Sequence, residues 1–587
     1  MRLNVLLLSL ALGTVANAQI IKPHPRVILG GTTLVADSNF LAQNDYQILR
    51  NENIRQADRL LGAQPRQYQI IEGSLLTVSR DVLANTLTLS MAYRLTGNEM
   101  YSQRAKVELL NAAGFPDWFP GHFLGTAEMT AAMGIGYDWL YPTLTEAERT
   151  KIRYAIVMKG LQPGMNEFTG GSDWARGSHN WTQVCSSGLT LGALAVYDEE
   201  PQLAAKIINF STKAAARTIR DYKPSGMPSE GPVYWRYGMN FHTMMSRSLE
   251  LSFGANRCIL KDKIYAETNK YPLIIQGSTG MNFNFGDASS SFYAPIASLE
   301  LSRIHNQPSI ASWATQAAVQ TATSQVEWSE ENRLMPLFVA WYSAPGIART
   351  TELPLDNGYT GQQSVVTLRG KWNDSNASFV AIKAGTNGTP HGQLDLGSFV
   401  YEAGGVRWAI DLGKDKYSLP GYFDVANGGR WKIFRNQTAA HNTLTFGTPN
   451  QSPTGRSTMA QVLSGQNPVV NVSLTAAYPR AAKSIARTFL FKNREDLMIT
   501  DSVDNSVNAW RWAMLTRASI ENSGRTAILK QDGKTLKVEI AEGAGQFAVV
   551  AATPYTAAEN QNEGVQMLTI QMPKGSSKLK VNLSLVR

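Results

Sequence analysis

The sequence has little of what marks several large protein classes. Its 587 residues include only two cysteines, Cys185 and Cys258, which fit no metal-ligand spacing, so we expect small buried side chains. After the N-terminus, no segment approaches ~18 consecutive apolar residues, which argues against a membrane span. There is also no block of lysine and arginine, although the formal net charge is +9. These absences argue against a disulfide scaffold, a membrane-spanning protein and a nucleic-acid-binding protein.

The N-terminus has the order of features of an export signal. Arg2 is followed by the apolar run Val5–Leu12 and by the small residues Ala16-Asn17-Ala18, so residues 1–18 are predicted to be a signal peptide. A buried N-terminal helix is the alternative. We expect an exported protein, periplasmic or secreted. A basic surface concentrates polyanions, and for an exported protein an acidic polysaccharide fits this role better than a nucleic acid.

The first part of the chain has helical periodicity. Trp181–Tyr197 contains no charged residue, which predicts a helix buried on nearly every side. Small residues from Gly125 to Gly136 indicate a second, closely packed helix. Further helices are expected at 36–62, 77–95, 98–113, 144–159, 200–221, 236–253, 292–305 and 329–343. Many helix pairs, some fully buried, suit an (α/α) toroid, with a layered bundle as the alternative.

The sequence changes character near residue 345, and from about residue 362 onward the period of the apolar pattern is two. Strands are expected at 364–369, 378–383, 398–402, 406–411, 442–446, 469–474, 487–492, 497–501, 536–540 and 579–585, with a hairpin turn at Gly404-Gly405. Many short strands with turns between them predict an antiparallel β-sandwich. Because 587 residues exceed one hydrophobic core, we expect two domains, 19–350 and 351–587, joined through Ser343–Gln362.

Two histidines of the strand half stand in unusual settings. His391 follows glycines and a proline, which predicts a loop that presents it at a domain edge. Gln393, Asp411 and His441 follow on neighbouring predicted strands. Because zinc binds histidine and carboxylate readily and an amide oxygen less commonly, these three residues are a candidate metal site. A direct hydrogen bond between Asp411 and His441 is the alternative.

Two segments of the helical half carry polar and aromatic residues together. Asn180, in Gly177–Trp181, is either a helix N-cap or an amide that faces a substrate carboxylate. The segment Glu230–Gly238 combines aromatic rings, which suit sugars, with an arginine fork, which suits carboxylate or sulfate. The candidate substrate-binding residues in this segment are Glu230, Trp235 and Arg236. Outside it, Trp181 and Arg435 are further candidates.

These motifs resemble the heparinase II/III-like polysaccharide lyases. The resemblance rests on SHNWTQVCSSGL, EGPVYWRYG, NFGD, HGQLDLGSF, WAIDLG and AHNTL, and it covers nearly the whole mature chain. It implies an (α/α) toroid followed by an antiparallel β-sandwich, with the active site in the cleft between them. It also implies β-elimination on a uronate polysaccharide such as heparan sulfate or alginate.

The resemblance also implies roles for single residues. Asn180 matches the amide that neutralises the uronate carboxylate, and His391 matches the catalytic histidine. A tyrosine of EGPVYWRYG matches the acid and base, and we prefer Tyr237 to Tyr234. Asp411 and His441 match two zinc ligands.

Two positions depart from the family pattern. Gln393 stands where a third histidine ligand is usual, which leaves zinc binding open. Trp181 stands where some relatives have histidine, so His179 is a candidate for that role.

Two other functions fit parts of the sequence. A glycoside hydrolase on a helical toroid would need paired carboxylates, for which Asp138, Asp173 and Glu230 are candidates. A glycan-binding protein without activity would explain Gln393 and Trp181. The substrate, endo or exo action and the oligomeric state stay open.

Overall fold

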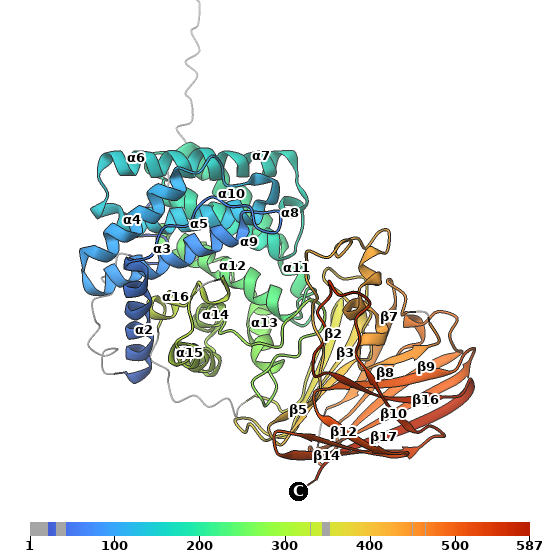
Figure 1. The fold of residues 1–587 in the computed structure, drawn as a ribbon. Coiled ribbons are helices and arrows are strands. Elements are labelled where there is room, and N and C mark those ends of the chain that lie inside the picture. Colours follow the sequence, from blue (N-terminus) through green and yellow to red (C-terminus); the bar gives the residue numbers. More distant parts are fainter. Residues whose placement is uncertain are drawn as a thin grey trace, which may run out of the picture.

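A computed structural model describes residues 21–30, 43–328, 330–342, 353–448, 450–463 and 465–586. The predicted signal peptide and residues 343–352 of the predicted linker lie outside these ranges. The helical half lies beside the strand half (Figure 1). Among the described helices, none combines the length and apolar character needed to cross a membrane.

Four long helices form the inner layer of the helical half. They are α3 (Leu76–Thr96), α5 (Phe123–Leu140), α9 (Asn180–Ala195) and α12 (Pro232–Phe253). Every residue of α5 is buried, as is every residue of α9 except Trp181. The two helices approach closely because glycines face each other: a Cβ on Gly134 would lie 2.9 Å from the Cα of Gly192. The predicted buried helices are therefore confirmed.

The other helices pack around these four, most of them as an outer layer, while α14 packs on α12 of the inner layer. They are α2 (Asn44–Leu61), α4 (Glu99–Ala113), α6 (Glu146–Ala155), α7 (Gln162–Gly170), α8 (Asp173–Arg176), α10 (Pro201–Arg217), α11 (Ile219–Tyr222), α13 (Lys263–Ile274), α14 (Ala297–His305), α15 (Pro308–Thr323) and α16 (Pro336–Ala340). Inner and outer helices pair, as α3 packs on α4 and α9 on α10. This is the paired arrangement expected of an (α/α) toroid. The helices expected from the sequence do not include α7, α8, α15 or α13, whose pattern Pro272 interrupts.

The strand half consists of antiparallel strands in two sheets. One sheet has the order β1-β2-β3-β7-β8-β9-β10-β17-β14-β13-β12, with β4 paired to β3 and β5 paired to β4, and the other has the order β15-β16-β11-β6. The strands are β1 (Asn357–Tyr359), β2 (Gln363–Arg369), β3 (Phe379–Thr386), β4 (Phe399–Ala403), β5 (Val406–Ala409), β6 (Leu444–Phe446), β7 (Arg456–Val462), β8 (Val469–Ser473), β9 (Ser484–Lys492), β10 (Asp496–Ser506), β11 (Trp510–Thr516), β12 (Ser519–Ser523), β13 (Thr526–Gln531), β14 (Lys534–Glu542), β15 (Phe547–Ala551), β16 (Gln566–Met572) and β17 (Gly575–Leu585).

The two sheets share a hydrophobic core. Side chains alternate between buried and accessible along β9, while Trp510 and Trp512 of β11 are fully buried. The predicted turn between β4 and β5 is confirmed: Gly404 and Gly405 have φ of +62° and +82°, which suits glycine.

A further apolar cluster joins the two halves. Trp235, Tyr271 and Phe285 of the helical half pack in one cluster with Phe379 and Val400 of the strand half. Burial of such large apolar side chains favours a fixed relative position of the halves. The cleft described next lies along this junction.

Candidate active site

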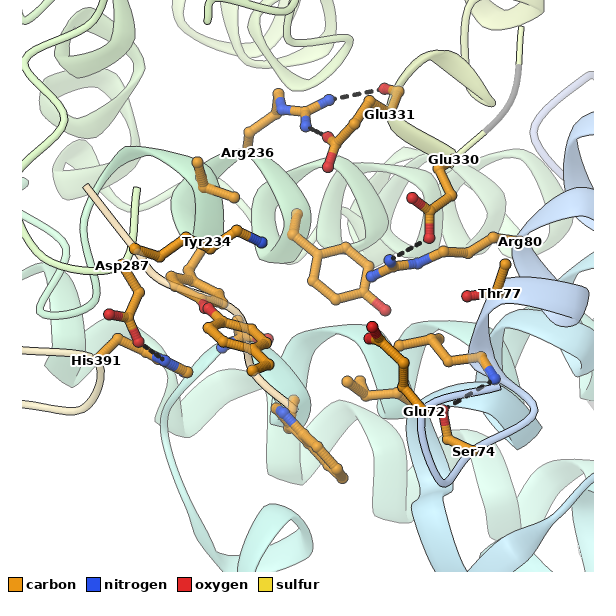
Figure 2. Close-up of a pocket in the computed structure, with 18 of the residues that line it drawn as sticks. Glu72, Ser74, Thr77, Arg80, Tyr234, Arg236, Asp287, Glu330, Glu331 and His391 are labelled. Atoms are coloured by element: carbon orange, nitrogen blue, oxygen red, sulfur yellow. Dashed lines mark hydrogen bonds and ion pairs between the residues drawn. The ribbon is translucent and has the colours of Figure 1, made fainter. Parts of the chain in front are cut away.

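A cleft of about 690 Å³ lies where the two halves meet. The helical half supplies most residues between Ile71 and Arg80, side chains from the first turns of α12, and most residues between Glu330 and Leu334. The strand half supplies His391 and residues between Lys414 and Phe423. Figure 2 shows side chains from both halves pointing into the cleft. The sequence-predicted residues on its walls are Asn180, Trp181, Tyr234, Arg236, Tyr237 and His391.

His391 is held in a loop with left-handed backbone, at φ +57°. Its Nδ1 lies 3.2 Å from Oδ2 of Asp287, which comes from the NFGD segment of the helical half. Asp287 also accepts hydrogen bonds from Arg430 and Tyr422, each at 2.8 Å. Burial alone would raise the pKa of Asp287, but His391 and Arg430 together hold it below the ordinary value. With Nδ1 facing a carboxylate, His391 is oriented so that Nε2 is the nitrogen left for a substrate.

Tyr234 lies directly against His391. The two rings stack with centroids 4.0 Å apart and planes 15° apart. The hydroxyl of Tyr234 hydrogen-bonds to that of Tyr417, and Lys414 lies 4.5 Å from the centre of the Tyr417 ring. Burial raises the pKa of Tyr234 well above its usual value, so the resting phenol is protonated.

Tyr237 lies one turn along α12, in a different environment. Its hydroxyl donates to Oε1 of Glu128 at 2.6 Å. Arg333 donates to both oxygens of the same carboxylate, at 2.8 and 2.9 Å, and Arg80 donates at 3.1 Å. Burial raises the pKa of Tyr237 as well. The hydroxyl of Tyr237 is thus engaged in a buried ionic network, whereas Tyr234 lies beside the histidine.

Asn180 is the first residue of α9, and His179 occupies the N-cap position. The alternative interpretation of Asn180 as an N-cap is therefore wrong. Its backbone N–H and its Nδ2 donate to the two oxygens of Glu230, at 2.8 and 2.7 Å. Oε1 of Glu230 lies 3.6 Å from Nε2 of His391. Since Nδ2 carries two protons, one remains for a ligand in the cleft.

The remaining predicted residues differ in position. Trp181 lies on the cleft wall with its ring 4.9 Å from that of His122, and Arg236 is paired with Glu331. His179, Trp235 and Arg435 are not on this wall.

Trp235 and Arg435 instead make contacts that stabilise the fold. Trp235 is 1% exposed, belongs to the apolar cluster that joins the halves and donates to Thr268. Arg435 binds Asn562 and the carbonyls of Leu412 and Lys414, so it holds a loop.

Several cleft residues were missed by the sequence reading. Asp287 lies within the NFGD motif, which carried the resemblance but suggested no role. Tyr417 and Lys414 follow WAIDLG closely, but nothing in their spacing predicts that they reach α12. Arg80 comes from α3, whereas Glu330 and Arg333 come from a segment 250 positions later, and only folding brings the two segments together.

A candidate metal site lies outside the lining of the cleft. Asp395, Asp411 and His441 are buried, and one ligand atom from each lies within 4.8 Å of the others. Oδ2 of Asp411 is 3.2 Å from Nδ1 of His441, so a direct hydrogen bond and shared metal ligation both fit this pair. The buried Nε2 of His441 and Oε1 of Gln393 have no hydrogen-bond partner among the described residues, which also fits a bound cation. One feature opposes it, because Lys383 is paired with Asp395.

The carboxylates considered for hydrolysis do not form a pair in the cleft. Asp138 is buried, accepts from the backbone of Arg26 and Val27, and lies 2.5 Å from His24. Asp173 opens the outer helix α8. Of the three candidates only Glu230 contacts cleft residues, through Asn180 and His391.

Comparison with known proteins agrees with this architecture. A family model described as Heparinase II/III-like, C-terminal matches residues 358–575. Residues 358–575 are therefore similar to this C-terminal domain. The resemblance predicted from the sequence motifs is thereby confirmed. No curated protein matches the chain.

Solved structures match over both halves. A heparinase III gene product superposes with a TM-score of 0.63 at 14% identity, covering 91% of this chain and 84% of its own. The heparan sulfate lyase HepC from Pedobacter heparinus gives 0.58 at 14% identity, covering 86% and 76%. Another heparinase III gives 0.60 at 12% identity, covering 94% and 88%. These matches confirm the predicted fold, a helical toroid followed by a β-sandwich.

Proposed function

We propose that this protein is an exported polysaccharide lyase that cleaves a uronate-containing glycan by β-elimination. The observation that supports it most strongly is the stack of Tyr234 on His391 beside Asn180, in a cleft between the two halves. The solved structures that share the fold are named as heparinase III and heparan sulfate lyase, which agrees with the proposal.

The reaction requires removal of the weakly acidic C5 proton of a uronate. Charge then accumulates on the neighbouring carboxylate, so a donor at that position lowers the barrier. The remaining proton of Asn180 Nδ2 is suited to this task, because Glu230 fixes the orientation of the amide.

Two neighbouring groups then move the protons. His391, oriented by Asp287, takes the C5 proton at Nε2. The bond from C4 to the glycosidic oxygen breaks as the C4–C5 double bond forms, and Tyr234 gives its phenolic proton to the leaving oxygen. Tyr417 holds the Tyr234 hydroxyl and stabilises the phenolate by hydrogen bonding. This assignment replaces our preference for Tyr237, whose hydroxyl is bound to Glu128.

We further propose that Asp411, His441 and either Gln393 or Asp395 hold zinc. Bound zinc would supply a fixed positive charge that orders its ligands. The loop that follows Asp411 carries Lys414 and Tyr417, so ordering Asp411 would support the strand-side wall of the cleft.

The proposal is tested with a panel of uronate glycans: heparin, heparan sulfate, heparosan, hyaluronan, chondroitin, alginate and glucuronan. Elimination introduces a double bond, so cleavage of one glycan should raise the ultraviolet absorbance. New reducing ends without this absorbance would indicate hydrolysis instead. Tight binding without either signal would indicate a glycan-binding protein, and both outcomes would reject the lyase.

A further inference from the structure

The helical wall of the cleft pairs its cations with carboxylates of the same wall. Glu331 pairs with Arg236 through its carboxylate and accepts a 2.8 Å hydrogen bond from Arg236 at its backbone carbonyl. Glu330 lies 3.4 Å from Arg80 (Figure 2). The third arginine, Arg333, is bound to Glu128 beneath the cleft.

The carboxylates form the more accessible layer of this wall. The side chains of Glu330 and Glu331 are 44% and 43% exposed, whereas those of Arg80, Arg236 and Arg333 are 20%, 14% and 7% exposed. A ligand that approaches this wall therefore meets negative charge first. Among the described residues that line the cleft, Lys414 is the cation for which no ion pair is found, and it belongs to the opposite wall.

We propose that Glu330 and Glu331 are specificity determinants that exclude sulfated sugars from the helical wall and favour an unsulfated uronate glycan. This inference rests on the proposed function and deepens it. The overall charge of +9 favours approach of any polyanion. Inside the cleft, however, a sulfate would have to displace a carboxylate from its guanidinium or lie beside it, whereas hydroxyl and acetamido groups can hydrogen-bond to the same carboxylates.

The test compares the wild type with the double variant Glu330→Gln/Glu331→Gln, which keeps the side-chain shape and removes both charges. Glu146→Gln/Glu327→Gln is the matched control, because these two side chains are 75% and 60% exposed and lie outside the cleft. The substrates are the unsulfated glycan cleaved fastest in the panel and the same glycan after chemical O-sulfation.

We expect the wild type to prefer the unsulfated form at least tenfold in kcat/KM. The cleft variant should reduce this preference at least threefold, while the control variant should not. A wild type that prefers the sulfated form, or an equal change in both variants, would overturn the inference.

A second measurement does not depend on cleavage. On immobilised heparin, the cleft variant should elute at higher salt than the control variant, which carries the same net charge. Equal elution would overturn the inference even if the protein is a lyase. A shift without cleavage of any glycan would support the inference and reject the proposed reaction.

Discussion

The two walls of the cleft are built from different chemistry. The helical wall carries arginines paired with glutamates beside apolar side chains such as Leu76 and Leu334, and Tyr237 is bound to Glu128 at its base. The strand-side wall carries an imidazole, the phenol of Tyr417 and the ring of Phe423. The proposed acid and base meet between the two walls, where Tyr234 of the helical half stacks on His391 of the strand half. Under the proposed function, charge selection would belong to the helical wall and proton transfer to the junction between the walls.

Substitutions of two tyrosines of α12 should give the largest effect and test the difference between the two walls. Tyr234→Phe should lower kcat by roughly 10²- to 10⁴-fold, because it removes the proposed acid at the junction. Tyr237→Phe should lower kcat by less than about tenfold, since its hydroxyl serves the Glu128 network. Initial rates from the ultraviolet absorbance, with thermal unfolding as the folding control, measure both. The reverse order would assign the proton donor to Tyr237 and its Glu128 network.

The next largest effect concerns the support of His391. Asp287→Asn should reduce the free energy of unfolding at pH 7 by about 3 kcal/mol, because Arg430 loses its buried counter-ion. The folded pKa of Asp287 is lowered, so its stabilisation is complete above the unfolded value of about 3.9 and is lost as pH falls through the folded pKa.

The difference between variant and wild type should therefore shrink below about pH 4. Urea titrations between pH 3 and 7 measure it, with Asp504→Asn as an exposed control. A difference that does not change with pH would contradict an ionised Asp287.

Substitution of Asn180 tests whether the helical half supplies the hydrogen-bond donor to the uronate carboxylate. Asn180→Ala should lower kcat about 10²-fold with a smaller change in KM, because the amide acts on charge that develops in the transition state. Glu230→Gln should have a smaller effect, since a glutamine can still accept from Nδ2. Loss of binding with kcat unchanged would instead assign Asn180 to ground-state recognition.

The smallest expected effect concerns the candidate metal site, which includes Asp411 and His441. Removing metal with a chelator should lower the unfolding free energy by about 2 kcal/mol, and zinc should restore it. His441→Ala should abolish this response, and elemental analysis should detect about one zinc per chain in the wild type only. A wild type without metal and without response to the chelator would leave Asp411 and His441 as a hydrogen-bonded pair.

The sequence predicted those parts of the structure that follow from local patterns. The charge-free helix α9 and the Gly404-Gly405 turn depend on neighbouring residues and were confirmed. The helix α13 was missed because Pro272 interrupts its pattern.

The candidate site was predictable only where a motif carried it. Asn180, Tyr234 and His391 lie in recognisable segments, and the structure brings them to one cleft. The contact of Tyr417 with Tyr234 joins residues 183 positions apart, and the pairing of Glu330 with Arg80 joins residues 250 positions apart. Such pairings arise from tertiary folding, so no local spacing in the sequence predicts them.

The apolar cluster that joins the halves has a consequence for any attempt to divide the chain. Trp235, inside that cluster, is the next residue after Tyr234. Cutting the chain between the toroid and the sandwich would expose Trp235 to water and separate Tyr234 from its imidazole neighbour at the same time. Separately expressed fragments should therefore aggregate or require each other in order to fold.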